Sequence, residues 1–320
     1  MQLSNEIISA SADAVKNGGQ HLFWSENINE SLEISIGQFG QTTPVLAQES
    51  DAGLELISGH ARLEVMKRLS NPVLVRVVTD ASPLDKGLLY LADNTHKEID
   101  DGMRLAALNY FAPLADSSYL RQTILPMIGI KSKSKNAKLL MRWLDLPNNW
   151  QHHMQAGRIP MAAGDVLLKM DKADRDAIEP LFDSFSWSRS NAVNMLTWLF
   201  EAGKMQGKTV AQVMADSGIT ATLGQGLSPK DAIARLTAVA KETRYPHLNS
   251  LQASFDKAAR DITTGTSWRM VQPNNFETGG TELTVSVKNV EQLDKATREL
   301  ETIGSSPQWK TIWSLGEQND

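Results

Sequence analysis

The first 112 residues alternate between two hydrophobic patterns, one with the period of a strand and one with the period of a helix. Short runs rich in Leu, Ile and Val predict strands, whereas apolar residues three or four positions apart predict helices. The expected elements are a helix over 29–39, an extended run over 41–48, a strand over 54–57, a helix over 63–69, a strand over 73–78 and a helix over 82–91. This alternation predicts a small α/β domain. Residues 1–20 have the pattern of a weak helix, to which we assign no function.

Two amphipathic helices follow. Their apolar residues recur at helical spacing, first at Leu120, Ile124, Leu125 and Ile128, then at Ala137, Leu140, Met141 and Leu144. Gly129 lies between them and can take the positive φ that turns a chain sharply. Ser132 or Ser134 can cap the second helix. The pattern therefore predicts a helix-turn-helix.

Helical spacing continues through most of the remaining chain. We expect helices over 150–156, 161–170, 172–182, 190–205 and 228–243. The glycine-containing segment 218–229 is the best candidate for a linker. The last part has the order helix, strand, strand, helix, over 247–262, 268–271, 281–287 and 290–303. A unit this small buries little apolar surface, which favours pairing with a second copy.

These patterns together predict a multidomain α+β protein. It would combine a small α/β N-terminal domain, an all-α middle domain with the helix-turn-helix, and a small αββα C-terminal domain. The predicted boundaries are a tail over 1–20, an α/β domain over 21–112, a helical domain over 113–217, a linker with a helix over 218–245 and a C-terminal domain over 246–320.

Composition limits the classes of protein that remain. The 320 residues contain no cysteine, which excludes a disulfide framework, cysteine-ligated zinc, iron–sulfur clusters and thiol chemistry. No run approaches the 18 apolar residues of a membrane span, and the first residues lack a basic start followed by an apolar stretch. We therefore expect a cytoplasmic protein with no membrane partner.

Charge is distributed unevenly along the chain. The net charge is −5, which disfavours indiscriminate binding to a polyanion. Residues 1–112 carry eight Lys or Arg against fifteen acids, a net −7, whereas residues 113–150 carry six against two, a net +4. A local basic surface can still bind DNA, because counterion release depends on the phosphates that are contacted.

The predicted helix-turn-helix supplies the candidate DNA-binding residues. Lys and Arg can neutralise phosphates, and Asn or Arg can also bind base edges in the major groove. The candidates are Lys131, Lys133, Ser134, Lys135, Asn136, Lys138 and Arg142, with Arg121 and Gln122 from the preceding helix. The alternative is an ordinary helical hairpin whose lysines are only solvated.

A second candidate site lies in the first domain. The turn Ser58-Gly59-His60-Ala61-Arg62 joins a strand to a helix, and a helix N-terminus attracts phosphate. Gly59 would allow close approach, Arg62 could bind bidentately and His60 could assist. Asp93 and Asn94 offer oxygens of the kind that hold Mg²⁺, with Lys97 one helical turn beyond Asp93. The alternative is a common glycine turn followed by an unrelated helix cap.

The order of these motifs resembles the ParB family of partition proteins over residues 25–185. The ParB/sulfiredoxin-like domain of that family has a Gly-Glu-Arg-Arg box and a Glu-Asn-x-x-Arg box, which fall here on Gly59–Arg62 and Asp93–Lys97. Gly40–Val45, GQTTPV, resembles a third segment, with Thr43 in the place of its Gln. The helix-turn-helix, which ends on Leu-Pro, and the later Gly157–Leu168 segment also resemble their counterparts. The order of elements over 246–320 is similar to that of the family's C-terminal dimerisation domain.

The boxes depart from the family pattern at four positions. His60 replaces Glu, Ala61 replaces Arg, Asp93 replaces Glu, and Lys97 replaces Arg. The sulfiredoxin branch of this fold needs a catalytic cysteine, which the chain lacks. Shortening the carboxylate at position 93 displaces a metal or water by about 1 Å, which can cost about 100-fold in rate. Binding of a nucleotide is thus better supported than hydrolysis, with Asp93 as the one candidate for a catalytic role.

The resemblance implies a homodimer that binds an inverted-repeat, centromere-like DNA site and closes as a clamp when CTP and Mg²⁺ bind. It implies nucleotide-binding roles for Thr43, Gly59, His60, Arg62, Asn94 and Lys97, with Mg²⁺ at Asp93 and Asn94. It also implies a Walker-type partition ATPase as a partner.

Two other functions stay open from the sequence. One is a transcriptional regulator on the same scaffold. The other is an enzyme, either a nucleotide hydrolase or a nuclease that uses Asp93, His96, Asp100 and Asp101 if they share a helix.

Overall fold

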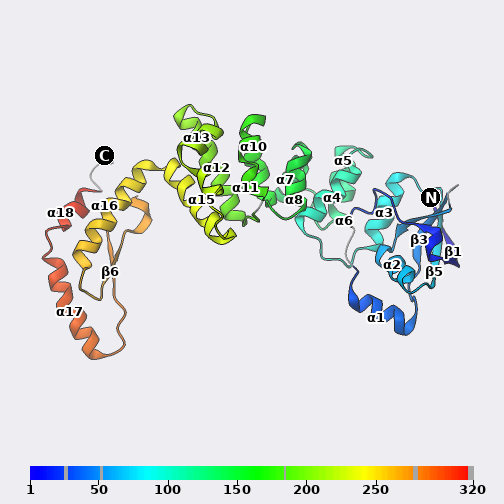
Figure 1. The fold of residues 1–320 in the computed structure, drawn as a ribbon, viewed down its shortest axis with the longest axis horizontal. Helices are drawn as coiled ribbons and strands as arrows, with labels where there is room; N and C mark the ends of the chain where they lie inside the picture. The colour runs from blue at the N-terminus through cyan, green and yellow to red at the C-terminus, as the bar shows by residue number, and fades with distance from the viewer. Residues whose placement is uncertain (25–27, 51–52, 184, 277–279, 316–320) are drawn as a thin grey trace.

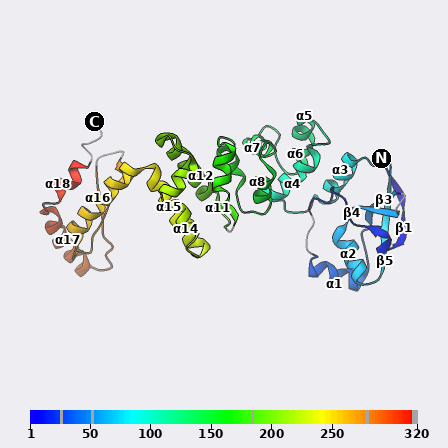
Figure 2. The same ribbon diagram turned by 45° about the horizontal axis from the view of Figure 1, so that its top comes forward.

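The computed structural model describes residues 1–24, 28–50, 53–183, 185–276 and 280–315. Figure 1 shows a mixed α/β part, a helical part and a small C-terminal part following one another along the long axis, with the N-terminus at one end and the last described helix towards the other. The same succession is seen after a 45° turn (Figure 2). No helix in the described part of the chain is long and apolar enough to cross a membrane.

The N-terminal part is built on a five-stranded mixed sheet. Its strands are β1 (Gln2–Ser11), β2 (Val15–Lys16), β3 (Val45–Ser50), β4 (Gly53–Ser58) and β5 (Pro72–Thr79), in the spatial order β1-β5-β3-β4-β2. β3 runs antiparallel to β4 and parallel to β5. The helices of this part are α1 (Glu30–Phe39), α2 (His60–Arg68) and α3 (Pro83–Asp93).

Alternation along the strands divides the apolar side chains between the two faces of the sheet. Val45, Ala47 and Val75 pack with α1 and α2 on one face. Ile57 and Val78 belong to a separate cluster that includes Leu89 of α3. The sheet is therefore covered on both sides, and its strand ends meet the ends of α2 and α3.

The weak helix predicted over residues 1–20 is wrong. Residues 2–11 form edge strand β1, which pairs antiparallel with β5, and residues 15–16 form β2 at the opposite edge. The β1 register shifts between Leu3 and Ile7, which breaks the strand alternation and leaves apolar residues at helix-like spacing. These residues are part of the sheet and not a tail.

The middle part is helical. It contains α4 (Asp101–Phe111), α5 (Ser117–Tyr119), a π-helical turn (Leu120–Ile124), α6 (Leu125–Met127), α7 (Lys135–Trp143), α8 (Asn148–Gln155), a 3₁₀ turn (Met161–Ala163), α9 (Gly164–Leu167), α10 (Lys172–Ile178), α11 (Pro180–Asp183), α12 (Arg189–Gln206), α13 (Val210–Asp216), α14 (Ile219–Leu223) and α15 (Pro229–Arg244). One core runs through it and also includes Trp24 and Tyr90. The N-terminal and helical parts thus share apolar packing.

Residues 218–245, predicted as a linker with a helix, contain that helix as α15 but pack into the helical part and do not form a linker. Ile219 of α14 is buried, and so are Leu236 and Ala240 of α15. All three belong to the same core as α12, and Arg244 Nε donates to Glu201 Oε2 of α12 at 2.6 Å. The helical part therefore continues to the end of α15.

The C-terminal part has the predicted order of helix, strand, strand, helix. Its elements are α16 (Pro246–Thr263), β6 (Arg269–Val271), a 3₁₀ segment (Pro273–Phe276), β7 (Glu282–Thr284), α17 (Val290–Gly304) and α18 (Trp309–Ser314). Helix α18 was not predicted. Phe255, Met270, Ile303 and Ile312 form the centre of its small core.

Candidate functional site: a basic helix and a polar pocket

Helix α7 begins where the sequence predicts the second helix of the hairpin. Gly129 has a φ of +77°, and a Cβ added there would meet nothing within 4 Å, so the glycine serves the backbone turn. Ser134 is the N-cap, and its hydroxyl accepts from Ala137 N–H at 3.1 Å. Ser134 thus has a structural role at the start of the helix.

One side of α7 is buried and the other is basic. Ala137, Leu140 and Trp143 are fully buried. Lys135, Lys138 and Arg142 are exposed, and their spacing of three and four residues puts them on one outward face. Asn136 is also exposed, but helical geometry places it to the side of that row.

The candidate DNA-binding side chains differ in their partners. Arg142 pairs with Asp165 of α9, and Gln122 donates to Ser118 Oγ at 3.0 Å. The other basic candidates are exposed, and their side chains make no hydrogen bond or ion pair with another described residue; they are Arg121, Lys131, Lys133, Lys135 and Lys138. These five cations are therefore available to an external anion.

The second site forms where the two central strands meet two helix ends. Leu46, at the start of β3, pairs with Ser58, at the end of β4. Helix α2 begins directly after Gly59, and α3 ends at Asp93. The sheet therefore brings the three predicted motifs together, although they are far apart in sequence.

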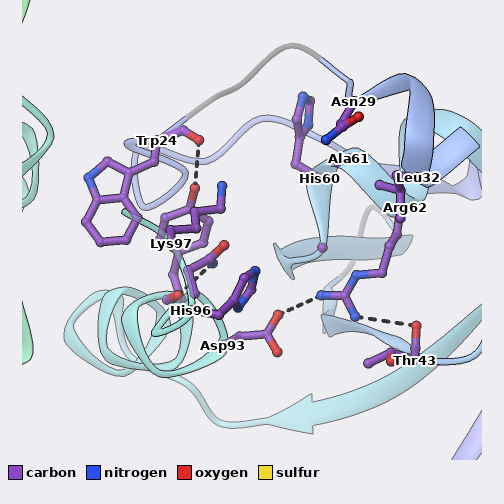
Figure 3. Close-up of a pocket in the computed structure, with 13 residues that line it drawn as sticks. Trp24, Asn29, Leu32, Thr43, His60, Ala61, Arg62, Asp93, His96 and Lys97 are labelled. Carbon is purple, nitrogen blue, oxygen red and sulfur yellow. Dashed lines mark hydrogen bonds and ion pairs between the residues drawn. The ribbon is translucent and has the colours of Figure 1, made fainter. Parts of the chain in front are cut away.

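A pocket of about 550 Å³ occupies this junction (Figure 3). All six predicted nucleotide-binding residues and Asp93 line it, together with Trp24, Asn29, Leu32, Ala61, Tyr90 and His96. Of the residues not predicted, Tyr90 lies one helical turn before Asp93, so helical spacing from Asp93 could have placed it at the pocket. Trp24, Asn29 and Leu32 precede the motifs and reach the pocket only through tertiary packing.

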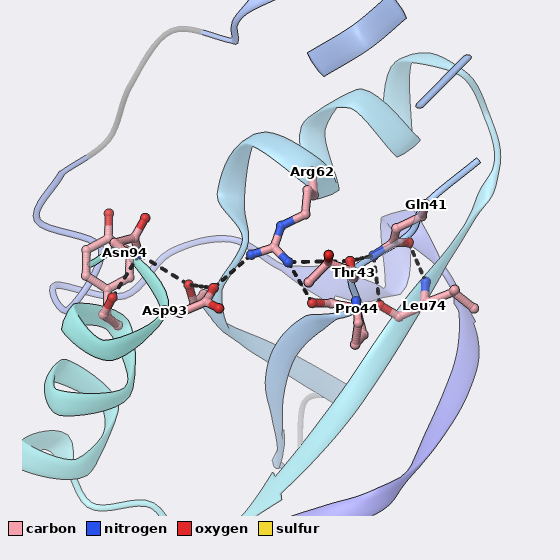
Figure 4. Close-up of polar contacts among 9 residues, drawn as sticks. Gln41, Thr43, Pro44, Arg62, Leu74, Asp93 and Asn94 are labelled. Carbon is pink, nitrogen blue, oxygen red and sulfur yellow. Dashed lines mark hydrogen bonds and ion pairs between the residues drawn. The ribbon is translucent and has the colours of Figure 1, made fainter. Parts of the chain in front are cut away.

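Arg62 is the centre of the hydrogen bonding in the pocket (Figure 4). Its guanidinium donates to the carbonyls of Thr43 (3.4 Å) and Pro44 (2.8 Å) and to Asp93 Oδ2 (2.8 Å). The Gln41 side chain fixes the same segment, because it bonds both N–H and C=O of Leu74 and the Thr43 carbonyl. Arg62 thus ties the segment before β3 to the end of α3.

The side chains of Asp93 and Asn94 already make hydrogen bonds within the protein. Asp93 Oδ2 also accepts from Ser58 Oγ at 2.6 Å. Asn94 is buried, and its Nδ2 donates to the Tyr90 carbonyl at 2.8 Å and to Ser58 Oγ at 3.4 Å. The second carboxylate oxygen of Asp93 makes no hydrogen bond with another described residue.

Gly59 is required at the start of α2. Its φ is +100°, and an added Cβ would lie 2.7 Å from Val45 Cγ1. Among the described residues no side chain caps α2, so its first N–H groups have no partner of that kind at the pocket. This arrangement suits an anion.

A hydrogen bond from Asn17 orients the ring of His60. Asn17 Nδ2 donates to His60 Nδ1 (2.6 Å) and to Glu64 Oε1 (3.1 Å). Because Nδ1 accepts, the neutral ring carries its proton on Nε2 and can donate from there. Burial, the largest single influence, raises the pKa of Glu64, but hydrogen bonds from Lys67 and Asn17 outweigh it and leave that pKa below its usual value.

Two predictions about this region need correction. Lys97 lines the pocket but does not continue α3, because the helix ends at Asp93 and Asn94 is its C-cap. The residues of the nuclease alternative do not share a helix either, since Asp100 is the N-cap of α4 and Asp101 its first residue. The described residues contain no group of three or more His, Asp or Glu that could hold a metal ion.

Comparison with known proteins gives similarity at the level of structure. No family model matches the sequence, and no curated protein matches it. A C-terminally truncated chromosome-partitioning protein ParB from Caulobacter crescentus, complexed to the centromeric parS site, is 14% identical over 59% of this chain and 98% of its own, with a TM-score of 0.37. The same protein complexed with CTP-γ-S is 17% identical over 56% and 99%, with a TM-score of 0.26. A Pnob8-like ParB-N domain is 16% identical over 80% and 98%, with a TM-score of 0.34. All three are structures of ParB or of a ParB-like domain.

Proposed function

We propose that this chain is a ParB-like, sequence-specific DNA-binding protein that acts in plasmid or chromosome partition. The observation that carries the proposal is the exposed basic face of α7, set behind the Gly129 turn in a chain whose net charge is −5. Its lysines would contact phosphates, and Asn136 would reach base edges from the N-terminal end of the helix. As a homodimer it would present two such helices to an inverted repeat.

The C-terminal part supports pairing. Val290, Leu293 and Leu300 of α17 are 71%, 50% and 40% exposed, and they recur at helical spacing. We propose that this stripe packs against a second copy. Leu293→Glu should convert the dimer to a monomer in light scattering, whereas Lys295→Glu, a nearby exposed substitution, should not.

DNA binding is tested with lysine variants. Lys133→Ala and Lys138→Ala should each weaken binding to a duplex selected from a random pool, and each should lower the salt slope by about one. Lys230→Ala, an exposed lysine on α15, is the matched control. Unchanged affinity and slope in both α7 variants would contradict the proposal.

For the pocket we propose a nucleoside triphosphate, CTP in the ParB pattern, which would gate closure of the DNA clamp. The start of α2, which no described side chain caps, offers donors for the phosphates together with Arg62, His60 and Lys97. Asn94 and Thr43 complete the polar wall of the pocket. Mg²⁺ fits only as a complex with phosphate, held by Asp93 and Asn94, because a metal of this type uses one or two carboxylates and substrate oxygens.

Calorimetry with CTP, ATP and GTP, in the presence of Mg²⁺ and the selected duplex, tests this second proposal. We expect heat of binding with one nucleotide and its loss in Lys97→Ala. No heat with any of the three would show that the altered boxes do not bind. A slow hydrolysis that disappears in Asp93→Ala would extend the proposal to catalysis.

The alternatives have their own tests. A gene for a Walker-type ATPase beside the gene for this chain would favour partition, with that ATPase as the partner, over transcriptional regulation. Metal-dependent cleavage of plasmid DNA that vanishes in Asp93→Ala would instead support the nuclease.

A further inference from the structure

A second hollow lies beside the basic face of α7. This groove, of about 530 Å³, is bounded by α7, α9 and α12. Lys135 and Leu139 of α7 line it, one helical turn apart. The groove therefore borders the helix that we propose enters DNA, on the side that carries Lys135 and Leu139.

The chemistry of the groove is apolar at its base and polar at its rim. Leu139 and Val166 are only 5% and 8% exposed. The rim carries Lys135, Arg189, Ser190 and Asn194, all exposed, and their side chains make no hydrogen bond or ion pair with another described residue. Polar groups above an apolar floor match a sugar-phosphate chain, which has anionic oxygens on one side and deoxyribose carbons on the other.

Helix α12 is oriented for this contact. It has 18 residues and begins at Arg189, and Ser188 caps it by accepting from Asn191 N–H at 3.4 Å. Ser190, Val193 and Asn194 are three or four residues apart, so they share the side of α12 that lines the groove. Arg189 extends the same edge at the positive end of the helix dipole.

One acidic residue, Asp165, lines the groove. Asp165 would repel a phosphate, but it accepts from Arg142 Nη1, so its charge is offset by a neighbouring cation. With that pair formed, Lys135 and Arg189 leave a positive rim.

We propose that this groove holds the DNA backbone that flanks α7, with Arg189 and Lys135 as phosphate ligands and Ser190 and Asn194 as further donors. The inference rests on the proposed function. A helix in a major groove about 12 Å wide has a phosphate strand on each side, and much of a DNA-binding surface contacts phosphate and not bases. Helix α12 would thus fix the position of α7 on the duplex.

The test compares Arg189→Ala with Arg235→Ala, an exposed arginine on α15 that removes the same charge away from the groove. Binding is titrated over a range of salt with the selected duplex and with a random-sequence duplex. Arg189→Ala should weaken both about tenfold and lower the salt slope by about one, whereas Arg189→Lys should keep the slope. Arg235→Ala should match the original chain.

Ser190→Glu gives a second measurement that does not depend on losing a contact. An acidic residue in the first turn of a helix favours folding, so the thermal midpoint should hold while DNA binding falls at least tenfold. If Lys138→Ala weakens binding but neither Arg189→Ala nor Ser190→Glu does, the groove inference is overturned and the proposed function stands. If the α7 variants also bind unchanged, the proposed function itself fails.

Discussion

The pocket and the α7 surface both contain the basic residues that sequence motifs single out, yet they use them differently. In the pocket, Arg62 bonds two backbone carbonyls and a carboxylate of its own chain. On α7, Lys135 and Lys138 make no such bonds with another described residue. A motif indicates which basic residues belong to a site. Only the fold decides whether their side chains bond to the protein itself or stay available to a ligand.

The difference has an energetic meaning. Hydrogen bonds to charged groups contribute roughly 1.5 to 3 kcal/mol each, so a phosphate that takes Arg62 must first replace protein acceptors. The α7 lysines exchange only water and counterions. We therefore expect DNA binding to depend steeply on salt, and nucleotide binding to depend on local rearrangement around Arg62.

The largest expected effect is a difference in stability between alanine variants of two glycines with positive φ, Gly59 and Gly129. Gly59→Ala forces both a left-handed backbone and a 2.7 Å contact with Val45 Cγ1, and should destabilise the fold by about 2 to 5 kcal/mol. Gly129→Ala meets open space and should cost only about 1 to 2 kcal/mol. Urea unfolding of the two variants measures the gap, and equal losses would contradict this account of Gly59.

The next prediction frees the cation of the pocket from one of its protein partners, as the lysines of α7 already are. Asp93→Asn removes the charge that holds Arg62 and should raise the affinity for pyrophosphate, measured without divalent metal, about tenfold. It should also lower stability by about 1 to 2 kcal/mol, because both side chains of the pair are mostly buried. Calorimetry gives the first quantity and urea unfolding the second. Weaker pyrophosphate binding would mean that Arg62 is not held back by Asp93.

The corresponding change beside α7 is made on α9, and it releases Arg142 from its ion pair. Asp165→Asn should tighten DNA binding about threefold, since it removes an anion near the duplex, and should change stability by less than about 0.5 kcal/mol because the pair is exposed. Asp145→Asn, which lies outside the groove lining, serves as the control. An equal gain in both variants would point to net charge and not to the Arg142 pair.

The smallest expected effect concerns acid stability of the sheet behind the pocket. His21 is 3% exposed, its Nε2 donates to the Leu56 carbonyl at 2.8 Å, and burial lowers its pKa below 6.5. Since the unfolded chain then binds a proton more readily, the His21 contribution is complete above pH 6.5 and is lost as the pH falls below it. The urea midpoint of the original chain should fall as the pH is lowered below 6.5, and the midpoint of His21→Gln should fall less. The same pH dependence in both proteins would contradict this role of His21.

The sequence predicts much of the fold where local signals agree. Asn29, Ser82 and Ser134 each cap a helix through the side chain, close to the start that the pattern predicts. Strand β1 was missed because its register shift leaves Leu3, Ile7 and Ala10 three and four residues apart, which is the spacing of a helix. Its pairing with β5 decides the outcome, and that contact is not local.

The candidate sites divide in the same way. Gly59, Arg62 and Asn94 could be placed in one pocket from motif order, and they line it. The Arg62–Asp93 pair, the hydrogen bond from Asn17 to His60 and the approach of Trp24 depend on tertiary packing. The contact of α12 with the groove was missed because no local pattern links Arg189 to Lys135, which lie on different helices.

The π-helical turn before Gly129 gives the hairpin an unusual tolerance. Leu125 N–H bonds the Leu120 carbonyl five residues back, so this turn contains one residue more than a regular α-turn. Deleting one residue there would let the turn revert to α geometry, and the residues on either side would keep their positions. A one-residue deletion within 120–124 should therefore leave the hairpin that follows intact.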